Sequence, residues 1–221
     1  MPTPPERRIP LWVKIAYSAF VAVLVPCYWV TYTPWNFLYF CDIALLATAV
    51  AIWIESPLLV SMQAVAITLP QTLWVLDLLC RLVVGAHLTG VTAYMLDARI
   101  SPFLRALSSY HGWLPLLLLW LLSRLGYDRR APVAQSAAAT LVLLASYLFA
   151  PAPPPSPDHP AWAVNINYVY GLDDRHPQTF MPPWLWLLTL IAFHLALLYP
   201  ITHLVLRRLF APPRRAESLR D

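Results

Sequence analysis

Six long apolar stretches dominate this sequence, and each is close to the length that crosses a lipid bilayer as a helix. About 20 apolar residues are needed to cross a hydrocarbon core of about 30 Å. Five stretches meet this length, and one (residues 133–149) meets it marginally. The stretches are residues 11–31, 35–54, 58–79, 103–122, 133–149 and 184–206. We therefore expect an all-α polytopic membrane bundle of about six transmembrane helices, with residues 1–221 forming a single transmembrane domain.

The composition also favours a lipid bilayer rather than water as the surroundings of this chain. Hydrophobic residues make up 59% of the chain and charged residues only 12%, whereas soluble domains carry about 25% charged residues. The net charge of +4 does not indicate nucleic acid, because the basic residues sit in short clusters beside the apolar stretches rather than along a basic-aromatic surface. The expected partners are membrane lipids, with possible membrane protein partners that the sequence does not identify.

Three segments fall outside the predicted spans. Residues 83–96 are apolar but too short to cross a bilayer, so we expect a re-entrant or interfacial segment. Residues 151–183 open with a run of prolines, which favours a stiff, extended external loop. Residues 211–221 form the expected cytoplasmic tail.

Basic residues predict the orientation, because cytoplasmic loops carry an excess of Lys and Arg. The first apolar stretch carries no small-residue cleavage site, so we expect it to be retained as a helix. With six spans, one side carries Arg7, Arg8, Lys14, Arg124, Arg129, Arg130, Arg207, Arg208, Arg214, Arg215 and Arg220. The other side carries Arg81, Arg99, Arg105 and Arg175. This asymmetry predicts a bacterial inner-membrane protein with both termini in the cytoplasm.

Polar residues within the spans gather in the outer half of the expected bundle. An ionisable residue in a span costs about 2.5–3.5 kcal/mol on insertion scales, so each is a candidate site. At about 1.5 Å of rise per residue, Cys41, Asp42, His111 and Gln71 lie at similar depths below the outer surface, and Asn36 lies at the outer mouth. The same residues are also typical of helix packing: a buried His or Asp pairs with a neighbouring helix, Cys behaves as a small hydrophobe, and Gln joins helices.

The surroundings of His111 favour an irregular helix. Pro115 has no N–H for the His111 carbonyl, and Gly112 permits close approach. Both features suit a ligand pocket, and both suit ordinary packing of membrane helices.

Three short stretches resemble a known family. The block NFLYFCDIALL, from Asn36 to Leu46, resembles the second-helix pattern of the bacterial YwaF-type integral membrane proteins. The HGW stretch that begins at His111 resembles a histidine–glycine motif on a later helix of that family. Asn167 and Tyr168 resemble its Asn-Tyr pair before the last span.

The resemblance implies an acyl-transfer chemistry. The YwaF-type family is similar to the androgen-induced-gene membrane hydrolases and to a transmembrane acyltransferase of ether phospholipids. In the hydrolases, a membrane histidine close to a Leu-Pro pair works with a threonine nucleophile, and His111 to Pro115 matches that context. The threonine position falls at Tyr39, which cannot accept an acyl group in its place. The resemblance to the acyltransferase implies Cys41 as the nucleophile instead.

The first functional hypothesis is therefore a lipid acyl hydrolase or acyltransferase with a polar site in the outer half of the membrane. His111 would act as general base, Cys41 as nucleophile, and Asp42 as orienter or charge stabiliser. The candidate substrate-binding residues are Asn36, Gln71, Asn167 and Tyr168.

Two other hypotheses remain open. A small-molecule carrier or ligand-binding protein could use the same polar layer, although no internal repeat of the kind found in carriers is evident. A scaffold protein could present residues 151–183 to a partner. No cofactor or metal is expected, because Cys27, Cys41 and Cys80 lack metal-ligand spacing.

Overall fold

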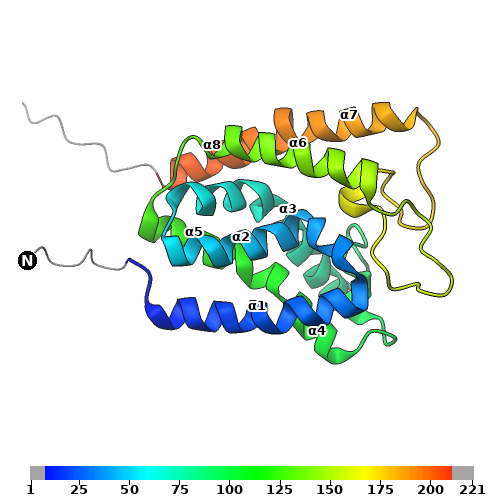
Figure 1. Cartoon of the computed structure of the whole chain (residues 1–221), viewed down its shortest axis with the longest axis horizontal. Coiled ribbons are helices and arrows are strands. Elements are labelled where there is room, and N and C mark those ends of the chain that lie inside the picture. Colours follow the sequence, from blue (N-terminus) through cyan, green and yellow to red (C-terminus); the bar gives the residue numbers. More distant parts are fainter. Residues whose placement is uncertain (1–7, 211–221) are drawn as a thin grey trace, which may run out of the picture.

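A computed structural model describes residues 8–210, and within that range the chain is all-helical. Six main helices run back and forth along one another (Figure 1). They are α1 (Leu11–Tyr32), α2 (Phe40–Ile54), α3 (Pro57–Val84), α5 (Tyr110–Leu125), α6 (Ala131–Phe149) and the continuous helix Pro183–Leu209. The last of these comprises α7 (Pro183–Phe193), a π-helical turn (His194–Leu198) and α8 (Tyr199–Leu209). The predicted all-α bundle is confirmed.

Four of the helices are long and apolar enough to cross a membrane. They are Leu11–Tyr32, Pro57–Val84, Ala131–Phe149 and Pro183–Leu209. The helix α2 is apolar but shorter, at 15 residues. The predicted third span of residues 58–79 is too short, because α3 continues to Val84 and passes through Pro70 without ending.

The predicted second span is interrupted at its start. Residues 35–39 do not belong to α2 but lie in and just after a 3₁₀ turn (Pro34–Leu38), and α2 begins at Phe40. Tyr39 breaks the helix with an extended conformation, φ −60° and ψ 138°. Asp42 therefore lies in the first turn of a helix, whereas the predicted span of residues 35–54 placed it about two turns along one.

The predicted fourth span is also interrupted. A short helix, α4 (Pro102–Ser108), ends before α5 begins at Tyr110. The break lies just before His111, while Pro115 lies inside α5 without ending it. In the last helix, the π-helical turn lies directly before Pro200, as expected where a proline withholds a donor from the preceding turn.

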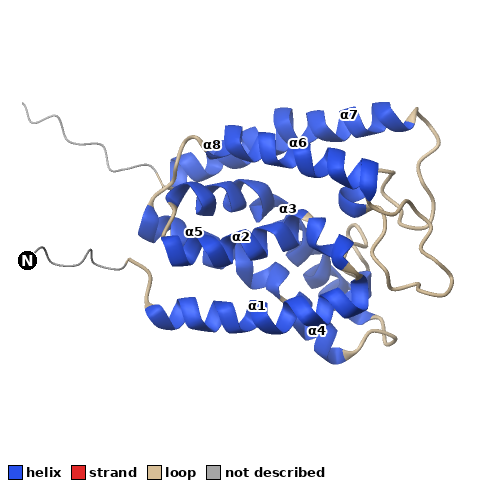
Figure 2. Ribbon diagram, viewed as in Figure 1, coloured by secondary structure: helices blue, strands red, loops and turns tan. Residues whose placement is uncertain are grey.

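The two ends of the bundle differ in character. One end, here called the basic end, collects the start of α1, the α5–α6 connection and the end of α8 (Figure 1). Its described basic residues are Arg8, Lys14, Arg124, Arg129, Arg130, Arg207 and Arg208. The opposite end, the loop end, carries residues 85–101 and 150–182, drawn mostly as loops in Figure 2. The predicted tail of residues 211–221 lies outside the described residues, as do Arg7, Arg214, Arg215 and Arg220.

The side chain of Glu55, which follows the end of α2, binds the start of α1 at the basic end. Its carboxylate accepts hydrogen bonds from Lys14 Nζ at 2.8 Å, from the Arg8 N–H at 3.0 Å and from the Ile9 N–H at 3.2 Å. Partial burial opposes ionisation, but these donors hold the pKa of Glu55 below its ordinary value. The carboxylate thus stays charged and fixes where α1 starts relative to the corner between α2 and α3.

Candidate functional site

The carboxylate of Asp42 is the centre of a buried polar cluster at the loop end. Asp42 is only 2% exposed. Asn36 Nδ2 donates to its Oδ2 at 3.0 Å, and Tyr110 Oη donates to its Oδ1 at 3.1 Å. The thiol of Cys41 donates to the same Oδ2, with Sγ 3.9 Å away. Three donors from the 3₁₀ turn, α2 and α5 thus converge on one carboxylate.

The start of α2 gives this cluster free backbone donors. Phe40, Cys41 and Asp42 are the first three residues of the helix, whose first N–H groups have no partner within the helix. The Phe40 N–H donates to Asn167 Oδ1 at 2.9 Å. Among residues 8–210, the N–H groups of Cys41 and Asp42 have no hydrogen-bond acceptor. The positive end of the helix dipole therefore lies beside the Cys41 thiol.

Asn167 shapes the helix break. Its Nδ2 donates to the Leu38 carbonyl at 2.8 Å, while its Oδ1 accepts from the Phe40 N–H. The side-chain amide thus satisfies two backbone groups that lose their helical partners at Tyr39. The hydroxyl of Tyr39 donates to the Val164 carbonyl at 3.0 Å, which also stabilises the helix break at Tyr39. Asn167 is therefore committed to positioning Cys41 and Asp42 rather than free to bind a substrate.

His111 lies beside the cluster but does not join it. Its Nδ1 is 2.8 Å from the Ser108 carbonyl, and its ring stacks on Trp74, with centroids 5.2 Å apart and planes at 19°. Within residues 8–210, His111 makes no hydrogen bond to Cys41 or Asp42. Because Nδ1–H donates to a carbonyl, Nε2 is left as the acceptor nitrogen of a neutral imidazole. The expected histidine–cysteine contact is thus replaced by a carboxylate–cysteine contact.

Tyr110 is the site residue that sequence reasoning missed. It is fully buried, like Leu114 and Leu118 one and two turns further on, so it reads as one more member of the apolar face of α5. Its hydroxyl is the only polar group on that stripe. A buried tyrosine hydroxyl needs a hydrogen-bond partner. This requirement could have indicated from the sequence that Tyr110 faces a polar group on another helix.

Further hydroxyl and indole groups surround the cluster. Tyr28 Oη and Ser108 Oγ lie 2.7 Å apart, which joins α1 to α4. Trp74 Nε1 donates to Tyr94 Oη at 3.2 Å. The indole that stacks on His111 is therefore held from the loop end by Tyr94.

Asp77 organises the segment predicted to be re-entrant or interfacial. Its fully buried carboxylate accepts from the N–H groups of Thr89, Gly90 and Thr92 at 2.5, 3.0 and 3.1 Å, and from both threonine hydroxyls. His87 Nδ1 lies 3.1 Å from the same carboxylate. The segment therefore folds back over the end of α3, and Asp77 is fully used in holding it there.

Gln71 and Tyr168 make no hydrogen bond to Asp42 among the described residues. Gln71 is 3% exposed, and neither atom of its amide has a hydrogen-bond partner among the described residues. The backbone carbonyl of Tyr168 accepts from Trp186 Nε1 at 2.8 Å, and the Tyr168 side chain is exposed. The structure thus brings together Asn36, Cys41 and Asp42, with Asn167 behind them.

Within residues 8–210, no cluster of three or more His, Cys, Asp or Glu side chains could hold a metal ion. Comparison with known proteins adds no relative: no family model, no curated protein and no solved structure matches the chain.

Proposed function

We propose that this chain is a membrane-embedded acyl hydrolase or acyltransferase of lipids, with Cys41 as the nucleophile. The observation that carries the proposal is the thiol of Cys41 donating to the buried carboxylate of Asp42 at the start of α2. A weak nucleophile needs an adjacent base, and Asp42 is held in place for that task by Asn36 and Tyr110.

The proposed reaction has two steps. The Cys41 proton passes to Asp42 as the sulfur attacks the carbonyl carbon of a lipid ester. The carbon–oxygen bond of the ester then breaks, and the departing alcohol takes the proton from Asp42. In the second step, water or another alcohol attacks the thioester and gives its proton to Asp42, which returns it to the leaving thiolate. The acyl group is thereby released or transferred.

The free N–H groups of Cys41 and Asp42 suit the developing oxyanion. Both belong to the residues at the reacting sulfur, and neither has an acceptor within the described part of the chain. Donors fixed before the reaction stabilise the charge of a tetrahedral intermediate. Asp42 serves as the base in both steps, and His111 makes no hydrogen bond to Cys41 or Asp42 among the described residues.

The resemblance to the YwaF-type family supports this proposal. The stretches of this chain that carry the resemblance, Asn36–Leu46 and the one that begins at His111, include Cys41 and Asp42. The direct test is turnover by the purified wild-type protein in phospholipid vesicles. Labelled fatty acid, or label moved to a second lipid, is expected above the level of protein-free vesicles. Full retention of the label on the original lipid, tested across diacyl and ether phospholipids, argues instead for a ligand-binding or scaffold protein.

On this proposal the basic end faces the cytoplasm of a bacterial inner-membrane protein, and Cys41 faces the outer half of the membrane. A single-cysteine pair tests this orientation in a variant that lacks the native cysteines. Ser156→Cys, exposed at the loop end, is expected to react with an impermeant maleimide in intact cells. Arg129→Cys, exposed at the basic end, is expected to react only after permeabilisation. The reverse pattern contradicts the orientation.

A further inference from the structure

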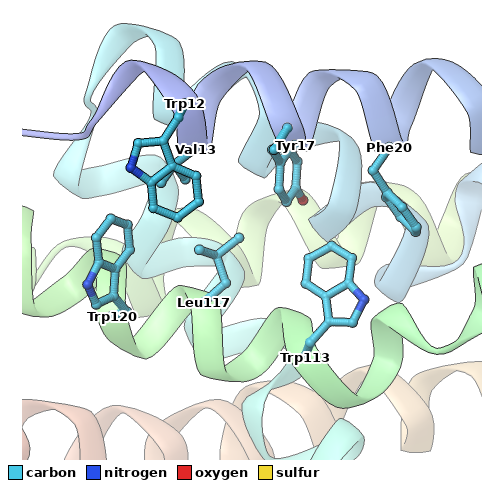
Figure 3. A pocket seen from close by; sticks show the side chains of 8 residues that line it. Trp12, Val13, Tyr17, Phe20, Trp113, Leu117 and Trp120 are labelled. Atoms are coloured by element: carbon cyan, nitrogen blue, oxygen red, sulfur yellow. The ribbon is translucent and has the colours of Figure 1, made fainter.

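An apolar groove lies between α1 and α5, on the part of the bundle that runs toward the basic end (Figure 3). Its volume is about 540 Å³. Trp12 faces Trp120 at one end, and Phe20 faces Trp113 at the other (Figure 3). No residue of the Asp42 cluster lines it, so it is separate from the proposed acyl-transfer site.

The groove has fixed walls, and its lining side chains are aliphatic or aromatic. Trp113 packs edge-on against Phe20, with ring centroids 5.0 Å apart, and against Tyr17 at 5.9 Å. The one hydroxyl among the lining side chains belongs to Tyr17 and donates to the Leu45 carbonyl at 2.8 Å. Trp12 and Phe20 are eight residues apart, which is about 12 Å along a helix. An elongated apolar occupant therefore fits the shape and the chemistry.

The groove ends beside a cation. Arg124 lies one turn beyond Trp120, and its guanidinium carbon is 5.6 Å from the Trp120 ring. Arg124 is exposed, and no carboxylate in residues 8–210 pairs with it. Lys14, by contrast, forms an ion pair with Glu55, with Nζ 2.8 Å from Oε1. Trp12, which is exposed, and Trp120, which is half-buried, mark the level where indole rings sit between acyl chains and headgroups.

We propose that this groove binds one acyl chain of an anionic phospholipid, whose phosphate pairs with Arg124. The apolar length matches a lipid tail, and a guanidinium binds phosphate through two parallel hydrogen bonds. The basic end supplies further positive charge, which favours an anionic headgroup over a zwitterionic one.

Photo-crosslinking in vesicles tests the proposal. Phosphatidylglycerol or phosphatidylcholine carries a photoreactive group on one acyl chain, and labelled peptides are mapped by mass spectrometry. Wild-type protein is expected to give labels on the facing sides of α1 and α5, with phosphatidylglycerol favoured several-fold. Ala16→Trp fills the groove from the wall of α1 and is expected to reduce this labelling by at least about 10-fold. Ala19→Trp is the matched control, because Ala19 is also exposed on α1 but does not line the groove.

Arg124→Gln is expected to lower the preference for phosphatidylglycerol to about one while labelling by phosphatidylcholine continues. Arg129→Gln, at an exposed arginine of the same end, is expected to keep the preference. Equal labelling of the wild-type groove by both lipids overturns the assignment of the headgroup. An equal loss in Ala16→Trp and Ala19→Trp, or crosslinks to a second protein copy in the groove, overturns the assignment of the occupant.

Discussion

Cys41→Ala is expected to lose at least about 1,000-fold in acyl turnover, the order of effect seen when a nucleophile is removed. The variant keeps the Asp42 carboxylate and its bonds from Asn36 and Tyr110, but no group remains to form the thioester. The measurement is release or transfer of labelled acyl groups by purified protein in vesicles.

Cys80→Ala is the matched control for this substitution. Cys80 is also half-buried and free, but it lies on α3 and is not among the described residues that donate to Asp42. It is expected to leave turnover within about two-fold of the wild type, since a half-buried cysteine acts as a small hydrophobe. Cys41→Ala protein that unfolds at the wild-type temperature and still keeps a tenth of the turnover contradicts the role of Cys41 as nucleophile.

Asp42→Asn is expected to lower turnover by about 100- to 10,000-fold, the range for loss of a general base. An asparagine has nearly the same shape and keeps an oxygen for Tyr110 or Asn36, but it cannot take the thiol proton. Asp42→Ala additionally leaves two buried donors without an acceptor, at about 1–3 kcal/mol each. It is therefore expected to lower the thermal stability as well.

Turnover and thermal unfolding, measured on both Asp42 variants in the same detergent, separate chemistry from folding. Loss of turnover in Asp42→Asn with an unchanged unfolding temperature supports a proton acceptor. Full turnover in Asp42→Asn, together with unfolding of Asp42→Ala, identifies the carboxylate as a clamp between α2 and α5 and removes it from the mechanism.

The sequence predicted the helices well, because a membrane span needs only length and low polarity. It misplaced the starts of α2 and α5, and the break before α2 depends on a distant partner. The break at Tyr39 is stabilised by Asn167, which lies 127 residues from Phe40. No local pattern near Tyr39 reports that contact.

The candidate site was predicted only in part, because the sequence does not show which residues from different helices are in contact. Depth along a span placed Cys41, Asp42 and His111 in one layer, but depth does not determine which face of a helix a side chain occupies. Tyr110 and His111 are neighbours on α5, and their ring centroids lie 4.1 Å apart, but they have different polar partners. Tyr110 therefore reaches Asp42, while His111 turns toward Trp74.

The acyl group on Cys41 is the most direct measure of the central claim. Wild-type protein is mixed with phospholipid bearing a labelled acyl chain, quenched in acid during turnover, and analysed by intact and peptide mass. We predict a mass increase of one acyl group on the peptide that contains Cys41, removed by neutral hydroxylamine. Turnover that proceeds with Cys41 unmodified, or with the acyl group on another residue, would contradict the proposed chemistry.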